Sequence, residues 1–173
     1  MKRALESLPR EITDAYEDIL KHPSTPVMFE ILSWIFYARE PLCMEALQEA
    51  LNVELGDIDL DRTVLPSNNL ILETCRSLVE ESSGFVGFTH GTVYKFLKDT
   101  KPKELWNASD LAKRLLTYLS FDVFKKPCRN EAELKERMKI NTLCGYAACW
   151  WPEYVRGEGE ENGEVLRLVA SIF

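Results

Sequence analysis

The sequence predicts a mainly α-helical chain with one small β-hairpin, and residues 70–97 give the clearest evidence for it. Apolar residues first recur there at the spacing of one helix face, namely at Leu70, Ile71, Cys75, Leu78 and Val79. Residues 82–84 then break the pattern with two serines and a glycine. Residues 85–90 alternate with the period of two that is typical of a half-buried strand. A helix, a two-stranded wing and a second helix together predict a winged-helix domain with a small β-wing.

The composition predicts a folded protein with an ordinary core. Of 173 residues, 46% are hydrophobic and 28% are charged, which argues against disorder over most of the length. The net charge of −7 disfavours nucleic acid as a partner, because affinity for phosphates depends largely on Lys and Arg. No apolar run approaches the roughly 20 residues that span a bilayer, and the N-terminus lacks a signal-peptide pattern. We therefore expect a cytoplasmic protein without a membrane partner.

Metal binding is not expected. The chain has no C-x-x-C pair, so its five cysteines are interpreted as reduced thiols, and its two histidines do not have zinc-ligand spacing. The alternating carboxylates Asp57, Asp59 and Asp61 resemble the start of a calcium loop. However, Arg62 stands where that loop needs glycine, and Asn68 stands where it needs glutamate. A solvated loop is the better interpretation.

Two helices are predicted ahead of the hairpin. Apolar residues of positions 8–20 share one face, and Pro23 follows the end of that helix. Thr25 then has the properties of an N-cap and Pro26 those of a first helical residue, opening a helix over residues 26–38. This second helix is apolar on nearly every face, so we expect it to be the central buried helix.

A short third helix precedes a long loop. Its apolar positions at helical spacing are Leu42, Met44, Leu47, Ala50 and Leu51. Charges, a glycine and a proline between residues 52 and 69 predict a loop. Residues 99–104 are polar, contain Pro102 and mark a domain boundary.

Helices are also predicted in the remainder of the chain. Asn107 is expected to cap a helix, with Asp110 as its reciprocal partner three residues later. The predicted core face of that helix comprises Leu111, Leu115, Tyr118 and Leu119. A charged helix is expected over residues 130–139. A further helix is marked by Ile140, Leu143, Tyr146, Ala147 and Trp150, and Pro152 should end or kink it.

The last segments differ in character. Residues 157–163 are acidic and glycine-rich, which predicts an unpacked loop or linker. Residues 164–173 begin a fresh amphipathic helix that stops in mid-pattern, which suggests that chain is missing. No internal repeat of solenoid length is present, so any such repeats would lie outside the sequence.

No catalytic residue is expected in this chain. It contains no phosphate-binding loop, no dinucleotide fingerprint and no nucleophile elbow. The helix that would enter a DNA groove offers Arg76, opposed by Glu73, and the wing begins with Glu80 and Glu81. A groove reader usually needs several cations, so DNA binding ranks below protein contact.

Several segments, taken together, resemble one protein family. The patterns are an L-P-x-x-L-x-x-x-Y helix, a buried W-[IL] helix, a wing ending in H-x-[ST]-V-x-x-[FY]-L, and a stretch closing on Y-A-A-x-x-W. The matching segments are residues 5–20, 31–54, 87–97, 111–124 and 143–156. They are similar to the region after the nucleotide-binding domain in fungal NACHT-type signalling NTPases, the STAND class related to NOD-like receptors.

The resemblance implies a division of the chain into regions. An N-terminal helix and a winged-helix domain would occupy residues 1–99, and a helical domain would occupy residues 105–156. Residues 157–163 would be an acidic loop, and residues 164–173 would begin a repeat region. A P-loop NTPase that binds ADP/ATP or GDP/GTP would lie upstream and ankyrin or similar repeats downstream, both as intramolecular partners. The chain itself would hold no cofactor.

The same winged helix is also named for GPI inositol deacylases. Their serine hydrolase elbow is absent here, so that activity is not carried over.

Specific residues also acquire expected roles from the resemblance. His90 matches a histidine that contacts the nucleotide of the upstream domain, and an imidazole at a helix N-terminus suits an anion. The alternative for His90 is a capping or core-satisfied residue. Trp150, Trp151 and Tyr154 are expected to form an interface with following repeats rather than a ligand cage.

Two positions depart from the family pattern. Cys43 replaces a hydroxyl N-cap, which would cost about 1 kcal/mol. Lys95 replaces the usual acid and would alter the local interface.

These observations favour a non-catalytic regulatory and interaction module of a STAND signalling NTPase, which couples nucleotide state to C-terminal repeats. Two alternatives remain open. One is an autonomous DNA-binding winged-helix protein, and the other is a free-standing helical adaptor for protein interactions.

Overall fold

The structure is a computed structural model that describes residues 9–21 and 25–172 of the chain. The expectations for Leu8 and Pro23 lie outside the described residues. The fold is mainly α-helical with one small antiparallel sheet, as predicted.

The N-terminal part contains the sheet. Its elements are α1 (Arg10–Leu20), α2 (Thr25–Tyr37), β1 (Leu42–Cys43), α3 (Met44–Leu51), α4 (Asn68–Thr74), β2 (Val79–Ser82), β3 (Phe85–Phe88) and α5 (Gly91–Thr100). The C-terminal part is helical. Its elements are α6 (Ala108–Leu119), α7 (Asp122–Lys125), α8 (Glu131–Ile140), α9 (Cys144–Val155), the 3₁₀ turn η1 (Glu158–Glu161) and α10 (Gly163–Ile172).

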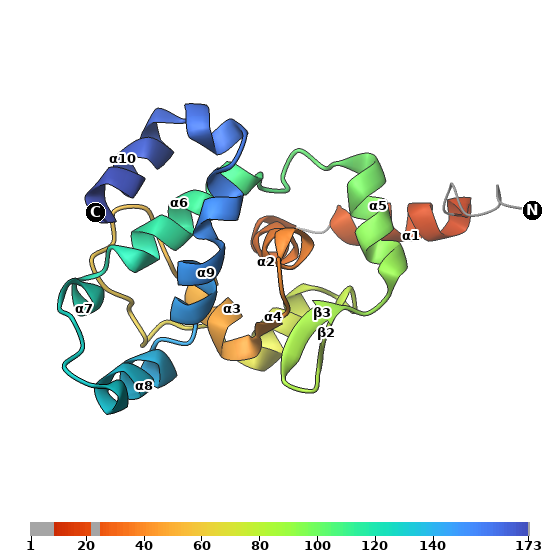
Figure 1. Ribbon diagram of the computed structural model, residues 1–173. Helices are drawn as coiled ribbons and strands as arrows, with labels where there is room; N and C mark the ends of the chain where they lie inside the picture. The colour runs from red at the N-terminus through yellow and green to blue at the C-terminus, as the bar shows by residue number, and fades with distance from the viewer. Residues whose placement is uncertain (1–8, 22–24, 173) are drawn as a thin grey trace, which may run out of the picture.

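Helix α2 lies at the centre of the molecule, between α5 on one side and α6 with α9 on the other (Figure 1). Met28, Ile31, Leu32 and Trp34 of this helix are fully buried or nearly so. The apolar character of α2 on nearly every face therefore has a direct structural counterpart, and the prediction of a central buried helix is confirmed.

The sheet contains three strands in the order β1–β3–β2, with both pairs antiparallel. Leu42 pairs with Val86, so a segment from before α3 joins the predicted hairpin. This strand was not predicted, because two residues are too few to show a periodic pattern. β2 and β3 form the predicted hairpin.

The helix ahead of the wing is shorter than predicted. Helical spacing suggested that it reached Val79, but α4 ends at Thr74 and Val79 begins β2. Arg76 and Ser77 both have positive φ, at 48° and 68°, which a helix does not allow. Cys75, Leu78 and Val79 are buried, but they lie in this turn and in β2 rather than in a helix. The helical spacing of the apolar residues therefore overestimated the length of α4.

The start of α6 has the predicted cap. The side chain of Asn107 accepts from the Asp110 N–H at 3.0 Å, and the Asp110 carboxylate accepts from the Asn107 N–H at 3.1 Å. This reciprocal arrangement is a capping box, and it fixes the helix boundary locally. Asn130 similarly caps α8 through the Glu133 N–H at 2.9 Å.

The sequence predicts that Pro152 ends or kinks its helix, and α9 does not end there. It continues to Val155 with the proline inside. A proline in a helix removes one backbone hydrogen bond. Here the last turn is held by Tyr154, whose side chain is fully buried.

The acidic segment after α9 is also more ordered than predicted. Residues 158–161 form η1 and Gly159 is buried, so the expectation of an unpacked linker is wrong at this point. A Cβ atom at Gly159 would lie 3.3 Å from the Tyr154 carbonyl oxygen. The missing side chain therefore lets this backbone approach the end of α9 closely.

The two parts of the chain share one hydrophobic core. The buried cluster includes Leu47 of α3, Leu115 of α6 and Ala147 of α9, on both sides of the predicted boundary at residues 99–104. Helix α6 packs against α9 and α10. Helices α1 and α10 lie at opposite ends of the molecule (Figure 1).

Candidate contact sites at His90 and at the α3–α6 junction

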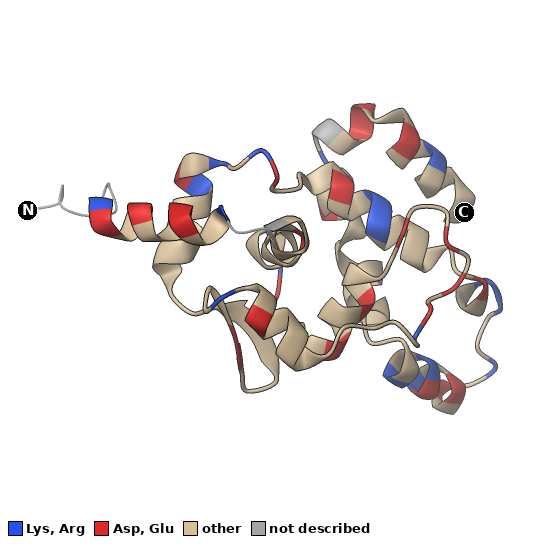
Figure 2. Cartoon of the chain, turned by 180° about the vertical axis from the view of Figure 1, so that it is seen from behind, with Lys and Arg blue, Asp and Glu red and all other residues tan. Residues whose placement is uncertain are grey.

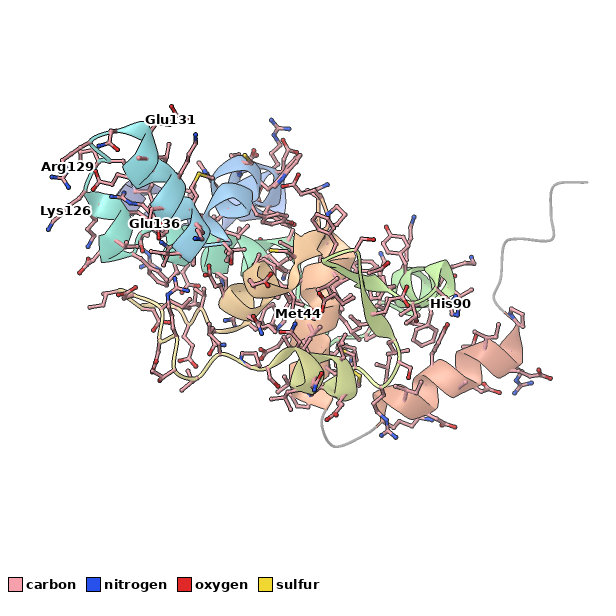
Figure 3. All side chains as sticks on the ribbon, turned by 90° about the horizontal axis from the view of Figure 1, so that it is seen from below. Met44, His90, Lys126, Arg129, Glu131 and Glu136 are labelled. Carbon is pink, nitrogen blue, oxygen red and sulfur yellow. The ribbon has the colours of Figure 1, made fainter. Side chains whose placement is uncertain are left out.

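His90 lies between β3 and α5 and is the N-cap residue of α5, with extended backbone angles. Its side chain is exposed and makes no capping hydrogen bond. The alternative of a capping or core-satisfied histidine therefore does not match its geometry. Figure 3 places His90 at the end of the molecule formed by α1 and α5, away from α8.

Helix α1 rests on α5 beside His90. The hydroxyl groups of Tyr16 and Thr92 are hydrogen-bonded at 2.8 Å, and the Tyr16 ring lies 5.3 Å from the Phe96 ring. None of the residues of α1 is buried, and Tyr16, Ile19 and Leu20 of this helix pack against the core.

The first turn of a helix leaves N–H groups without intrahelical acceptors, and its dipole favours anions. An exposed imidazole at this position can therefore donate to a phosphate or carboxylate of a neighbouring domain.

The surface around the wing is acidic. Glu73 of α4 and Glu80 and Glu81 of β2 are exposed, and Arg76 is the cation beside them. Figure 2 shows acidic residues along the wing and along α1. This distribution is unfavourable for a duplex phosphate backbone.

The structure describes Cys43 and Lys95, the two positions at which the sequence differs from the pattern it resembles. Cys43 is the N-cap residue of α3 and makes no side-chain capping hydrogen bond. Lys95 forms an ion pair with Asp99 at 3.2 Å on the surface of α5. This ion pair ties Lys95 to its own helix.

A buried carboxylate joins the two parts of the chain. Glu49 of α3 is only 2% exposed, and its Oε2 accepts from the Tyr118 hydroxyl of α6 at 2.6 Å. Its Oε1 accepts from Arg62 Nη1 at 2.9 Å. The backbone N–H groups of Thr142 and Leu143 donate to the same carboxylate at 3.2 and 3.0 Å. The buried charge is thus compensated by one cation and three neutral donors.

Arg62 extends this arrangement to the start of α9. Its Nη2 donates to Asn141 Oδ1 at 2.8 Å, and Asn141 Nδ2 donates to the Arg137 carbonyl at 2.8 Å. Burial and the hydrogen bond to Glu49 raise the pKa of Tyr118, so its hydroxyl remains a donor at neutral pH. We call Glu49, Arg62, Tyr118 and Asn141 the junction network.

A second link joins the end of α2 to α9. The Arg39 N–H donates to the Tyr146 hydroxyl at 3.1 Å, and the Tyr154 hydroxyl donates to the Tyr37 carbonyl at 2.8 Å. The two tyrosine hydroxyls are hydrogen-bonded to each other. Each hydroxyl has one proton, so the direction of this chain is fixed: Tyr146 must donate to Tyr154.

The aromatic residues at the end of α9 occupy different environments. Tyr154 is fully buried within this chain, so it does not present a surface to following repeats as expected. Trp150 and Trp151 are partly buried and pack against the core. The indole N–H of Trp150 has no acceptor within the described part of the chain. Trp150 and Trp151 therefore remain the candidates for a contact with a partner.

The structure offers few sites for other chemistry. Within residues 9–21 and 25–172, no group of three or more His, Cys, Asp or Glu side chains is arranged to hold a metal ion. No helix in these ranges is both long enough and apolar enough to cross a membrane. All five cysteines are free, and burial raises the pKa of Cys75 to about 12. Its thiol is therefore protonated and unreactive at neutral pH.

Sequence reasoning missed Glu49, although a signal was present. Ala46, Ala50 and Val53 are buried and lie three to four residues apart, so Glu49 shares their face of α3. An acid on such a face needs partners. The four donors could not be inferred, because they come from three distant segments.

Comparison with known proteins gives no further guide to function. No protein-family model, curated protein or solved structure matches the chain.

Proposed function

We propose that this chain is a non-catalytic regulatory module of a STAND-type signalling NTPase, in which His90 contacts the nucleotide bound by a neighbouring domain. The module would transmit the state of that nucleotide to the C-terminal part of the protein through protein contacts. ADP/ATP or GDP/GTP would be bound by the neighbouring NTPase domain rather than by this chain.

The order of the elements supports a winged-helix interpretation. α2, β1, α3, α4, β2 and β3 follow one another, and β3 lies between β1 and β2 in the sheet. A winged helix places its first strand beside a later hairpin in this way. The acidic surface of α4 and β2 favours contact with protein over contact with DNA.

The proposal rests on the exposure of the His90 side chain and on its lack of a capping hydrogen bond. Its imidazole is exposed at the N-terminus of α5 and is not used by the cap of that helix. A donor in this position can reach a phosphate oxygen of an apposed domain at little cost, because it breaks no capping bond.

A route for transmission is also available. The junction network and the hydrogen bonds among Tyr37, Tyr146 and Tyr154 connect α2 and α3 with α6 and α9. Buried polar contacts rather than a flexible linker connect these elements. A displacement at the His90 end would therefore be transmitted to α6 and α9.

The test is the rate of nucleotide release from the full-length gene product. We expect His90→Ala to release fluorescent ADP or GDP about 10-fold faster or more, because a charge-assisted hydrogen bond contributes about 1.5–3 kcal/mol. Lys98→Ala, an exposed residue on the same helix, is the matched control and should release nucleotide at the wild-type rate. Unchanged release from His90→Ala would remove the sensor role, and a full-length product without an NTPase domain would overturn the proposal as a whole.

A further inference from the structure

A surface cleft lies on the side of α2 that faces α4. The start of α2, the end of α3, residues 64–66 and α4 surround a volume of about 510 Å³. Ile71 of α4 is buried at this site. Val27, Val64 and Leu70 line the cleft and are 54%, 62% and 54% exposed.

Three large apolar side chains from three separate segments thus gather at one opening. Scattered exposed apolar residues are ordinary, whereas a gathered set marks a contact surface.

The wall formed by the long loop is held in place by side-chain contacts. Gln48 Nε2 donates to the Pro66 carbonyl at 2.7 Å and to Asn68 Oδ1 at 2.9 Å. Arg114 donates to the Val53 carbonyl near the start of the same loop, and Arg62 fixes its middle through Glu49. The cleft is therefore preformed, which lowers the ordering cost of binding.

Glu30 of α2, a half-buried acid, lines the cleft together with the neutral polar residues Asn52 and Thr74. Glu30 of α2 has neither a hydrogen bond nor an ion pair within 4.0 Å among the described residues. The cation that acts on it most strongly is Arg114, whose guanidinium donates to Val53 and lies 4.1 Å from the Trp106 ring centre. Burial raises the pKa of Glu30, because its charged form is partly desolvated without a direct partner. A cation delivered by a ligand would compensate this carboxylate.

We propose that this cleft docks an amphipathic helical segment of a partner protein, with apolar side chains one turn apart and a Lys or Arg that pairs with Glu30. A helix laid in a groove presents apolar anchors at i and i+4, which can contact the exposed apolar side chains Val27, Val64 and Leu70 of the cleft. Glu30 then selects a basic segment over an acidic one. This site lies on residues other than His90 and requires no nucleotide, so it stands independently of the proposed sensor role.

The probe is an alanine-rich helical peptide of about four turns, with leucines spaced one turn apart and one variable position beside them. Binding to the 173-residue chain is followed by fluorescence anisotropy, with Lys, Gln or Glu at the variable position. We expect the Lys peptide to bind about 10-fold more tightly than the Glu peptide, and Glu30→Gln to abolish that difference.

Two further variants test the location. Leu70→Asp and Val64→Asp should each weaken the Lys peptide about 10-fold or more, and both change exposed side chains that the fold does not need. Leu134→Asp on α8 is the matched control, since Leu134 is 45% exposed and lies outside the cleft, and it should bind normally. Circular dichroism of each variant verifies the fold.

Three results would overturn the proposal. The first is no saturable binding of the Lys peptide, and the second is equal affinity for the Lys and Glu peptides. The third is a concentration-dependent dimer that disappears in Leu70→Asp, because the occupant would then be a second copy of this chain.

Discussion

Glu49 of α3 and Tyr118 of α6 are joined by a buried hydrogen bond of 2.6 Å, although 69 positions separate them in the chain. The carboxylate also accepts from Arg62 and from two N–H groups ahead of α9. One side chain therefore connects the sheet-bearing part of the molecule to its helical part. We expect this contact to contribute strongly to cooperative folding.

Glu49→Ala should destabilise the protein by about 3 kcal/mol or more. It removes the acceptor of four donors and leaves Arg62 without its anionic partner. The Arg62 side chain is 39% exposed, so water compensates part of the loss and holds the cost near the lower end of the range for buried pairs. The measurement is the free energy of unfolding in urea. Glu136→Ala, an exposed acid on α8, is the control and should change it by no more than about 0.5 kcal/mol.

A double-mutant cycle isolates the link itself. Tyr118→Phe should cost about 1.5–3 kcal/mol, because the carboxylate loses one donor while the ring is retained. Glu49 and Tyr118 should then show a coupling energy of about 1 kcal/mol. Strictly additive losses would show that the two residues stabilise the fold separately.

Tyr154→Phe should destabilise the protein by about 1–3 kcal/mol. The variant keeps the buried ring but leaves the Tyr37 carbonyl without this donor and Tyr146 without its acceptor. Tyr94→Phe is the matched control, since Tyr94 is 43% exposed and stacks on Phe36 through its ring alone. Equal melting temperatures for Tyr154→Phe and the wild type would contradict the importance of this chain of hydrogen bonds.

Because of Cys75, the free energy of unfolding should depend on pH in the alkaline range. Its pKa is raised from 9.0 to about 12 by burial, so the native state holds its proton more tightly than the unfolded state does. The contribution of this thiol to the free energy of unfolding is fully present below pH 9. It is lost as the pH rises towards 12, by roughly 1.4 kcal/mol per pH unit.

The free-energy difference between the wild type and Cys75→Ala should therefore shrink as the pH rises above 9. The measurement is urea unfolding at pH values from neutral to alkaline. A constant difference across this range would indicate that the thiol is not held in its neutral form. In the native protein the exposed Cys149 should also react with a thiol reagent well before Cys75.

The DNA-binding alternative predicts a shift of a labelled duplex by the isolated chain at low salt. We expect no shift, because the exposed acids Glu73, Glu80 and Glu81 outnumber Arg76 on the α4 and β2 surface that would approach DNA. A double variant, Glu80→Lys with Glu81→Lys, serves as a positive comparison and should gain weak, salt-sensitive binding. Salt-dependent binding by the wild type would favour the alternative.

The sequence alone determined the features that depend on near neighbours in the chain. Helix α2 is central because its own residues are apolar on nearly every face. The capping box of Asn107 and Asp110 involves two side chains three residues apart, so its pattern is visible without a fold. The hairpin of β2 and β3 and the position of His90 at a helix start follow from similarly local patterns.

Only the tertiary structure decided the features that depend on distant partners. The end of α4 is set by the turn at Arg76 and Ser77, and the length of α9 by the burial of Tyr154 against Tyr37. The partners of Glu49 and the residues that line the cleft beside Glu30 come from separate segments. Periodicity reports on which face of an element is apolar, whereas the burial of a polar side chain depends on donors that folding brings together.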